Sequence, residues 1–125
     1  MSTELITGQT IEQRDFAEAD EVRTFDNGRA EILKMGGMEI GRLVLSPGWR
    51  WSENVKPIAG TDLCEAPHFQ YHLQGTLRIQ MADGTELDAT AGDVTALPQG
   101  HDAWVVGDEA VVVVDWWGAS NYAKD

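Results

Sequence analysis

The sequence is poor in cysteine, with Cys64 as its single thiol among 125 residues. One cysteine cannot form a disulfide within the chain, and a free thiol fits a reducing compartment. The first sixteen residues, MSTELITGQTIEQRDF, lack the basic and apolar regions of a secretory signal. No apolar run approaches the roughly 20 residues that a membrane-spanning helix needs. We therefore expect a cytoplasmic protein without a membrane segment.

Positive charge is also scarce. Lysine and arginine together number 9 against 21 aspartates and glutamates, which gives a formal net charge of -12 at pH 7. An acidic surface repels the phosphates of nucleic acids and the headgroups of anionic membranes. Both are therefore excluded as expected partners, and a small-molecule ligand is the partner class that we expect.

Long helical periodicity is missing as well, and short apolar segments separated by glycine-rich turns take its place. Gly36-Gly37 separates RAEILKM from MEIGRLVL, and Asp83-Gly84 separates TLRIQM from TELDAT, as in β-hairpins. Closely spaced strands of this kind are typical of an all-β sandwich or barrel. We expect an N-terminal arm over residues 1–20, a single β domain over 21–118 and a C-terminal tail over 119–125.

One predicted strand, HFQYHLQ, places polar and apolar side chains on opposite faces, because strand residues alternate. His68, Gln70 and His72 share one face, and Phe69 and Tyr71 share the other. The pattern by itself favours a sheet that turns its polar face to water. The alternative is that the two histidines line a polar cavity.

Three residues offer soft metal ligands: Cys64, His68 four positions later, and His101 after the turn LPQG. A thiolate and two imidazoles suit iron, zinc, nickel or copper better than calcium or magnesium. The alternatives are a buried cysteine acting as a small apolar residue and histidines that are only hydrogen-bonded. Along a regular strand His72 lies about 13 Å from His68, so we expect the two not to share an ion.

These residues resemble the two sequence motifs of the cupin family of small β-barrel proteins. In its first motif, His-x-His is followed after three or four residues by Glu or Gln, and a glycine lies seven positions after that residue. Counting back seven positions from Gly75 puts His68 at the Glu position, with Asp62 and Cys64 at the His-x-His positions. The second motif places His101 after the Pro-x-Gly turn. The segments GTDLCEAPH and PQGHDAWVVGDE also resemble small single-domain bacterial cupins of unassigned activity.

The resemblance implies a cupin-type antiparallel β-barrel, or jelly roll, with a divalent transition metal held by Cys64, His68 and His101. Iron and zinc are the leading metals, with nickel and copper as alternatives. Asp62 is either a further ligand or a turn residue, and Gln70 and His72 are further ligands or substrate contacts. Three protein ligands leave positions open for water or substrate.

Two functions follow from this interpretation, and a structural barrel with a vestigial site is the third alternative. The first is a metal-dependent enzyme acting on a small organic molecule, with the ion as Lewis acid or dioxygen site. The second is a non-catalytic module that binds or senses a small molecule. No catalytic acid or base is identified from the sequence.

Other residues allow two interpretations each. Asp102 either caps a turn through its own backbone, which we favour, or orients His101. Trp49 and Trp51 either line the mouth of a cavity or cover a neighbouring subunit. The segment AVVVVDWW is apolar on both faces and therefore typical of a strand buried on two sides. Together with the resemblance, it leads us to expect a homodimer.

Overall fold

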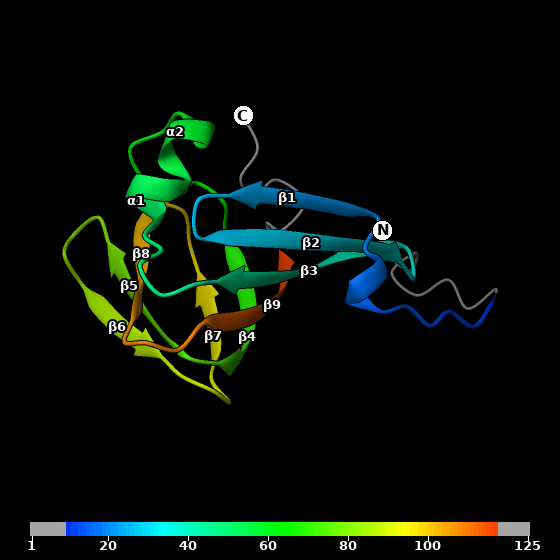
Figure 1. Ribbon diagram of the computed structural model, residues 1–125. Coiled ribbons are helices and arrows are strands. Elements are labelled where there is room, and N and C mark those ends of the chain that lie inside the picture. Colours follow the sequence, from blue (N-terminus) through cyan, green and yellow to red (C-terminus); the bar gives the residue numbers. More distant parts are fainter. Residues whose placement is uncertain (1–9, 118–125) are drawn as a thin grey trace.

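A computed structural model describes residues 10–117, which form two antiparallel β-sheets packed face to face (Figure 1). The larger sheet has the strand order β1-β2-β3-β9-β4-β7 and the smaller one the order β6-β5-β8. The strands are β1 (Glu21–Phe25), β2 (Gly28–Met35), β3 (Met38–Leu45), β4 (His68–Gln74), β5 (Thr76–Met81), β6 (Glu86–Ala89), β7 (Val94–Leu97), β8 (His101–Val106) and β9 (Val111–Trp117). The predicted all-β antiparallel class is confirmed, as two separate sheets rather than one closed barrel.

Both predicted hairpins are present. Gly36 and Gly37 join β2 to β3 with φ angles of 59° and 77°, the left-handed values that a tight hairpin turn requires. Asp83 and Gly84 join β5 to β6, and the Asp83 carboxylate accepts a hydrogen bond from the Thr85 amide at 2.9 Å. Local turn chemistry therefore sets the strand registers on both sheets.

The core lies between the two sheets. Leu43, Leu45 and Val113 of the larger sheet meet Leu77 and Ile79 of the smaller one in a single apolar cluster. Alternating residues of each strand supply this cluster, as expected for two sheets with facing apolar sides.

Two short helices, α1 (Trp51–Asn54) and α2 (Lys56–Ala59), follow β3 and cover one end of the sandwich (Figure 1). The Asp102 carboxylate on β8 accepts hydrogen bonds from the Ser52 amide at 3.0 Å and from Arg50 Nε at 3.3 Å. Asp102 thus caps the N-terminus of α1 from another element. The same carboxylate also accepts a hydrogen bond from the adjacent Ala103 amide at 2.8 Å, so the favoured contact with its own backbone is present beside the cap of α1.

Strand β4 has its faces reversed relative to the orientation favoured from its pattern. Its polar residues His68, Gln70 and His72 are 1–3% exposed, whereas Phe69 and Tyr71 are 41% and 37% exposed. The pairing of β4 with β9 sets this orientation, because Gln70 lies opposite Asp115 and His72 opposite Val113 on the inner face. The expectation that the polar face meets water was wrong.

The described part of the N-terminal arm packs on the hairpin of β2 and β3. A 3-10 turn, η2 (Phe16–Glu18), lies beside Arg42, whose guanidinium is 5.0 Å from the centre of the Phe16 ring. The Asp20 carboxylate accepts a hydrogen bond from the Lys34 amide at 2.7 Å. Within residues 10–117, no helix has the length and apolar character needed to cross a membrane.

Two glycine substitutions test how closely the chain at Gly75, directly after β4, approaches the backbone of Ala110. Gly75 has a φ of 80°, and a Cβ there would lie 2.5 Å from the carbonyl oxygen of Ala110. Gly84 has a similar φ of 91° but open space around it. We expect Gly84→Ala to lower the free energy of unfolding by about 1–2 kcal/mol through backbone strain alone. Gly75→Ala adds a backbone clash and should cost about 3 kcal/mol or more in urea denaturation. Equal losses would contradict the close approach at Gly75.

Candidate metal centre

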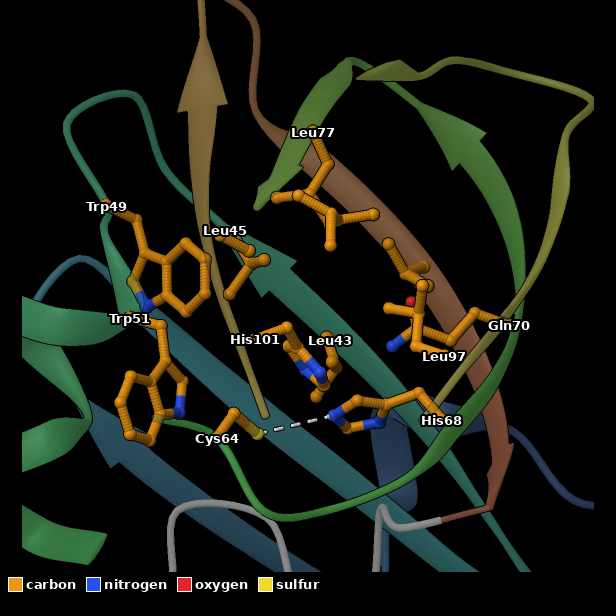
Figure 2. Close-up of a pocket in the computed structure, with 13 residues that line it drawn as sticks. Leu43, Leu45, Trp49, Trp51, Cys64, His68, Gln70, Leu77, Leu97 and His101 are labelled. Atoms are coloured by element: carbon orange, nitrogen blue, oxygen red, sulfur yellow. Dashed lines mark hydrogen bonds between the residues drawn. The ribbon is translucent and has the colours of Figure 1, made fainter. Parts of the chain in front are cut away.

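A pocket between the two sheets contains most of the residues singled out from the sequence (Figure 2). Leucine, isoleucine, valine and alanine side chains form much of its wall, together with Trp49 and Trp51, which are both 2% exposed. The cavity is small, about 20 Å³, which is room for about one water molecule. The two tryptophans therefore line the pocket of their own chain.

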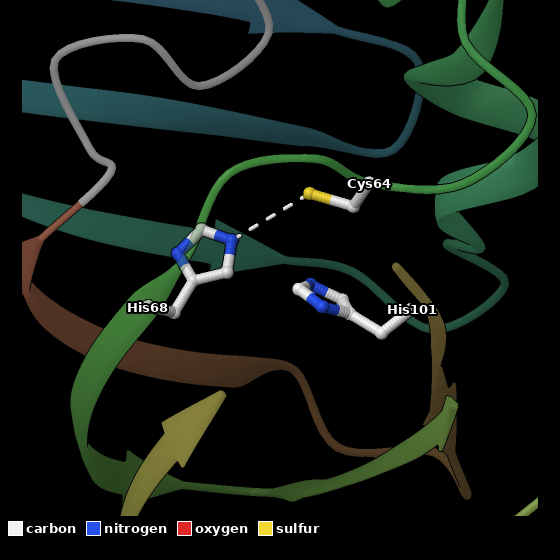
Figure 3. A group of neighbouring side chains, drawn as sticks. All are labelled: Cys64, His68 and His101. Atoms are coloured by element: carbon white, nitrogen blue, oxygen red, sulfur yellow. Dashed lines mark hydrogen bonds between the residues drawn. The ribbon is translucent and has the colours of Figure 1, made fainter. Parts of the chain in front are cut away.

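Cys64, His68 and His101 bring their ligand atoms to within 4.8 Å of one another in this pocket (Figure 3). All three side chains are 3% exposed. His68 begins β4 and His101 begins β8, while Cys64 is tied to His101 by a backbone hydrogen bond of 2.8 Å from its amide to the His101 carbonyl. Backbone pairing thus joins ligands that lie 37 positions apart in the sequence.

Both imidazoles are held through Nδ1. His68 Nδ1 donates to the Asp115 carboxylate at 2.5 Å, and His101 Nδ1 donates to the Pro98 carbonyl at 3.0 Å. Carbonyl and ionised carboxylate oxygens only accept hydrogen bonds, so each Nδ1 carries a proton. His68 Nε2 lies 3.7 Å from Cys64 Sγ. Nε2 is thus the atom that each ring has left for a metal ion, the usual arrangement for ligating histidines.

Asp115 is the functional residue that sequence reasoning missed. Its side chain is fully buried on β9, and it also accepts a hydrogen bond from Gln70 Nε2 at 3.3 Å. The signal was present as the one carboxylate inside the apolar segment AVVVVDWW. A charged group in such a segment needs a partner when it is buried.

The pKa values of Cys64 and His68 are shifted in opposite directions. Burial raises the pKa of the Cys64 thiol, but hydrogen bonds with His101 and His68 outweigh burial and bring this pKa down to about 6. Burial lowers the pKa of His68, but hydrogen bonds with Asp115 and Cys64 outweigh it and raise this pKa to about 9. Near neutral pH the metal-free site therefore pairs a thiolate with an imidazolium.

Two buried polar atoms among the described residues have no hydrogen-bond partner: Trp49 Nε1 and Gln70 Oε1. Both side chains line the pocket. A buried polar group left without a partner costs about 1–3 kcal/mol. The pocket thus has one donor and one acceptor that an occupant can satisfy.

Comparison with solved structures gives the fold a name. The polyketide cyclase RemF from Streptomyces resistomycificus matches with a TM-score of 0.62 and 14% identity, over 88% of this chain and 80% of that one. A protein of unknown function from Rhizobium leguminosarum matches with a TM-score of 0.63 and 17% identity, over 87% and 97% of the two chains. The chain has the cupin fold.

A third cupin structure is the oxalate decarboxylase of Lactobacillus farciminis in its formate complex. It matches with a TM-score of 0.58 and 16% identity over 87% of this chain, which spans 34% of that enzyme. No protein-family model matches the sequence, and the search of curated proteins found no match either. At these identities the likeness establishes the cupin fold and leaves the activity to be argued from the site.

The remaining residues expected from the cupin motifs lie outside the cluster. Asp62 has a fully exposed side chain, 3.5 Å from Lys56 Nζ, so it occupies the turn role and does not reach the pocket. His72 is buried, and its Nε2 lies 2.9 Å from Thr95 Oγ1. Burial lowers the pKa of His72, which favours a neutral ring. His72 is not among the residues whose ligand atoms gather in the cluster.

The charge state of the cluster can be measured in chelator-treated protein. We expect the ultraviolet absorbance of the Cys64 thiolate to titrate with a midpoint near pH 6, far below the ordinary thiol value of 9.0. Because this pKa is lowered in the folded state, the stability that the thiolate contributes is lost as the pH falls through 6. Because the His68 pKa is raised from 6.5, its contribution is lost as the pH rises through 9.

Variants show whether His68, rather than burial, sets the pKa of the Cys64 thiol. His68→Gln should move the thiolate midpoint upward, whereas His72→Gln, another buried site on β4, should leave it in place. Cys64→Ser should abolish the transition. A wild-type midpoint near 9 would contradict the thiolate–imidazolium pair.

Proposed function

We propose that the protein binds a divalent transition metal through Cys64, His68 and His101 and is a metal-dependent enzyme acting on a small organic molecule. The observation that carries this proposal is the orientation of the two rings, each with Nδ1 engaged. A tetrahedral ion with Zn–S near 2.3 Å and Zn–N near 2.1 Å separates its sulfur and nitrogen ligands by about 3.6 Å. The 3.7 Å between Cys64 Sγ and His68 Nε2 fits that geometry.

Iron and zinc are the leading metals in this proposal, with nickel and copper as alternatives, since the donor set is one thiolate and two imidazoles. A bound ion supplies Lewis acidity at the positions that three protein ligands leave open, and iron adds redox chemistry. The chain's own contribution is orientation: Asp115 and Pro98 hold the two rings, and the apolar wall limits the water that enters. We also propose a cytoplasmic location, because a buried free thiol that serves as a ligand must stay reduced.

In this proposal the substrate is not oxalate, the compound named for the oxalate decarboxylase neighbour. Oxalate is a dianion, and in this proposal the charge of a divalent ion is already offset by the Cys64 thiolate and the neighbouring Asp115 carboxylate, so a site for oxalate needs further positive side chains. The described residues that line the pocket include no lysine or arginine. We therefore infer an uncharged substrate.

The second candidate is a non-catalytic cupin module that binds or senses a small molecule. A specific observation favours it: the titratable residues among the described lining of the pocket are Cys64, His68 and His101 themselves. If all three are ligands, the described lining holds no further side chain for proton transfer. Turnover by the metal-loaded protein distinguishes the two candidates, which share the metal site.

Elemental analysis of protein purified without added metal or a metal-affinity tag tests the site. We expect about one transition-metal ion per chain in the wild type, lost in Cys64→Ser, His68→Ala and His101→Ala. His72→Ala is the matched control, since it removes a buried imidazole from the same strand. Metal retained in all three ligand variants would reject the site, and metal lost equally in the control would show that β4 as a whole had been disrupted.

Metal affinity should depend steeply on pH if Cys64, His68 and His101 are the ligands. Protons compete with the ion for the thiolate and for both imidazoles. We expect affinity to fall sharply below about pH 6, where Cys64 becomes protonated. A competition titration with a chromogenic chelator measures this, and an affinity that stays constant from pH 5 to 8 would contradict thiolate ligation.

We further propose that the protein forms a homodimer through the outer face of the larger sheet. Apolar side chains gather there on β4, β7 and β9: Phe69, Tyr71, Leu73, Val94 and Trp116 are each 37–60% exposed. With Met38, four of them line a groove of about 430 Å³. Contiguous exposed apolar surface marks interaction sites. The residues that line the groove carry no charge, so contact through it avoids the direct repulsion between two chains of net charge -12.

Sedimentation velocity tests the dimer. Val94→Glu places a charge in the groove and should convert a dimeric wild type to monomer. Leu87→Glu is the control, because Leu87 is 45% exposed on β6 of the other sheet. A monomeric wild type, or dissociation by both substitutions, would reject this interface.

A further inference from the structure

The buried amide of Gln70 is oriented by its neighbour. Asp115 Oδ2 accepts a hydrogen bond from Gln70 Nε2 at 3.3 Å. An ionised carboxylate only accepts hydrogen bonds, so the NH2 end of the amide must face it and the oxygen must be the other end. Oε1 is left without a partner although the side chain is 3% exposed.

Gln70 lines the same pocket as the candidate metal ligands (Figure 2). Asp115 receives both His68 Nδ1 and Gln70 Nε2 on one oxygen, Oδ2. One carboxylate therefore sets the orientation of the ring and of the amide together. The pocket presents Oε1 as a pre-positioned acceptor, and a ligand that satisfies it must bring a hydrogen-bond donor.

We propose that Gln70 Oε1 accepts a hydrogen bond from a hydroxyl group of the ligand, so that the site selects uncharged, hydroxyl-bearing small molecules over carboxylates. This inference rests on the proposed function for the identity of the pocket as the ligand site. A hydroxyl is about the size of a water molecule and fits a cavity of about 20 Å³. A hydroxyl can donate to Oε1 and also accept from the unpartnered Trp49 N–H, whereas a carboxylate can only accept and would set an oxygen against Oε1. The described lining also has no lysine or arginine.

Methanol and formate are suitable probes, since both are small and they differ in the features that matter. Methanol is neutral and donates a hydrogen bond, whereas formate is an anion that only accepts. The binding readout is the methyl resonance of Ala103, a buried residue that lines the pocket. The side-chain amide resonances of Gln70, identified by their loss in Gln70→Met, report on the proposed contact itself.

In wild-type protein we expect methanol to shift both the Ala103 and the Gln70 resonances saturably, with a lower midpoint than formate. Gln70→Met keeps the length of the side chain and removes the acceptor, so it should raise the methanol midpoint about threefold to tenfold. Gln74→Met is the matched control on the same strand, since Gln74 is exposed and donates to the Ala110 carbonyl at 3.0 Å. It should leave the midpoint unchanged.

Three outcomes in the metal-free protein would overturn the proposal: no saturable methanol shift, a formate midpoint equal to or below that of methanol, or equal methanol midpoints in Gln70→Met and Gln74→Met. If Gln70→Met does not fold, the wild-type comparison of the two probes decides. The titrations are run on chelator-treated and on zinc-treated protein, with zinc content measured separately. Failure to bind zinc rejects the proposed metal site, while the metal-free titration still decides the role of Gln70 by the same criteria.

Discussion

The hydrogen bond between His68 and Asp115 is the interaction on which the rest of the site depends. Asp115 is a fully buried carboxylate in a strand otherwise made of valine and tryptophan. Burying such a group is costly unless charged and hydrogen-bonded partners surround it. His68 Nδ1 and Gln70 Nε2 are partners of that kind, and the backbone amide of Phe69 adds a longer contact at 3.4 Å. Asp115, a carboxylate on β9 outside the Cys/His/His cluster, therefore holds His68 and Gln70 in place in the pocket.

This interaction lies beside an irregularity in strand β4. The ladder between β4 and β9 is irregular between Phe69 and Gln70, next to the position where Gln70 pairs with Asp115. A β-bulge re-aims the side chains on either side of it, and bulges are common next to functional sites. Here the irregularity accompanies a strand whose imidazoles and amide point inward. The apolar residues of β4 consequently form an outer row, so the same strand supplies the candidate metal centre and the proposed dimer surface.

The cupin fold by itself does not determine the activity, whereas the residues that line this pocket limit the chemistry that it can perform. The structural neighbours include a polyketide cyclase and an oxalate decarboxylase, two different activities on one architecture. In this chain the cluster joins a thiolate to two imidazoles, and the described lining of the pocket is otherwise apolar apart from Gln70 and the indole N–H groups. A small, largely apolar cavity strengthens electrostatic interactions with a bound ligand. The pairing of Cys64 with His68 and the unpartnered oxygen of Gln70 are thus the features that distinguish this site.

The amino-acid sequence determined the parts that depend on neighbouring residues. Gly36-Gly37 and Asp83-Gly84 predicted two hairpins because their backbone preferences act locally. The Cys64 and His68 spacing and the turn before His101 identified the three residues that the structure brings together. Tertiary structure alone decided which face of β4 is buried, since an alternating strand has the same pattern either way round. It also decided that Asp62 lies in solvent and that Asp115 supports His68, because that contact joins residues 47 positions apart through the register of two paired strands.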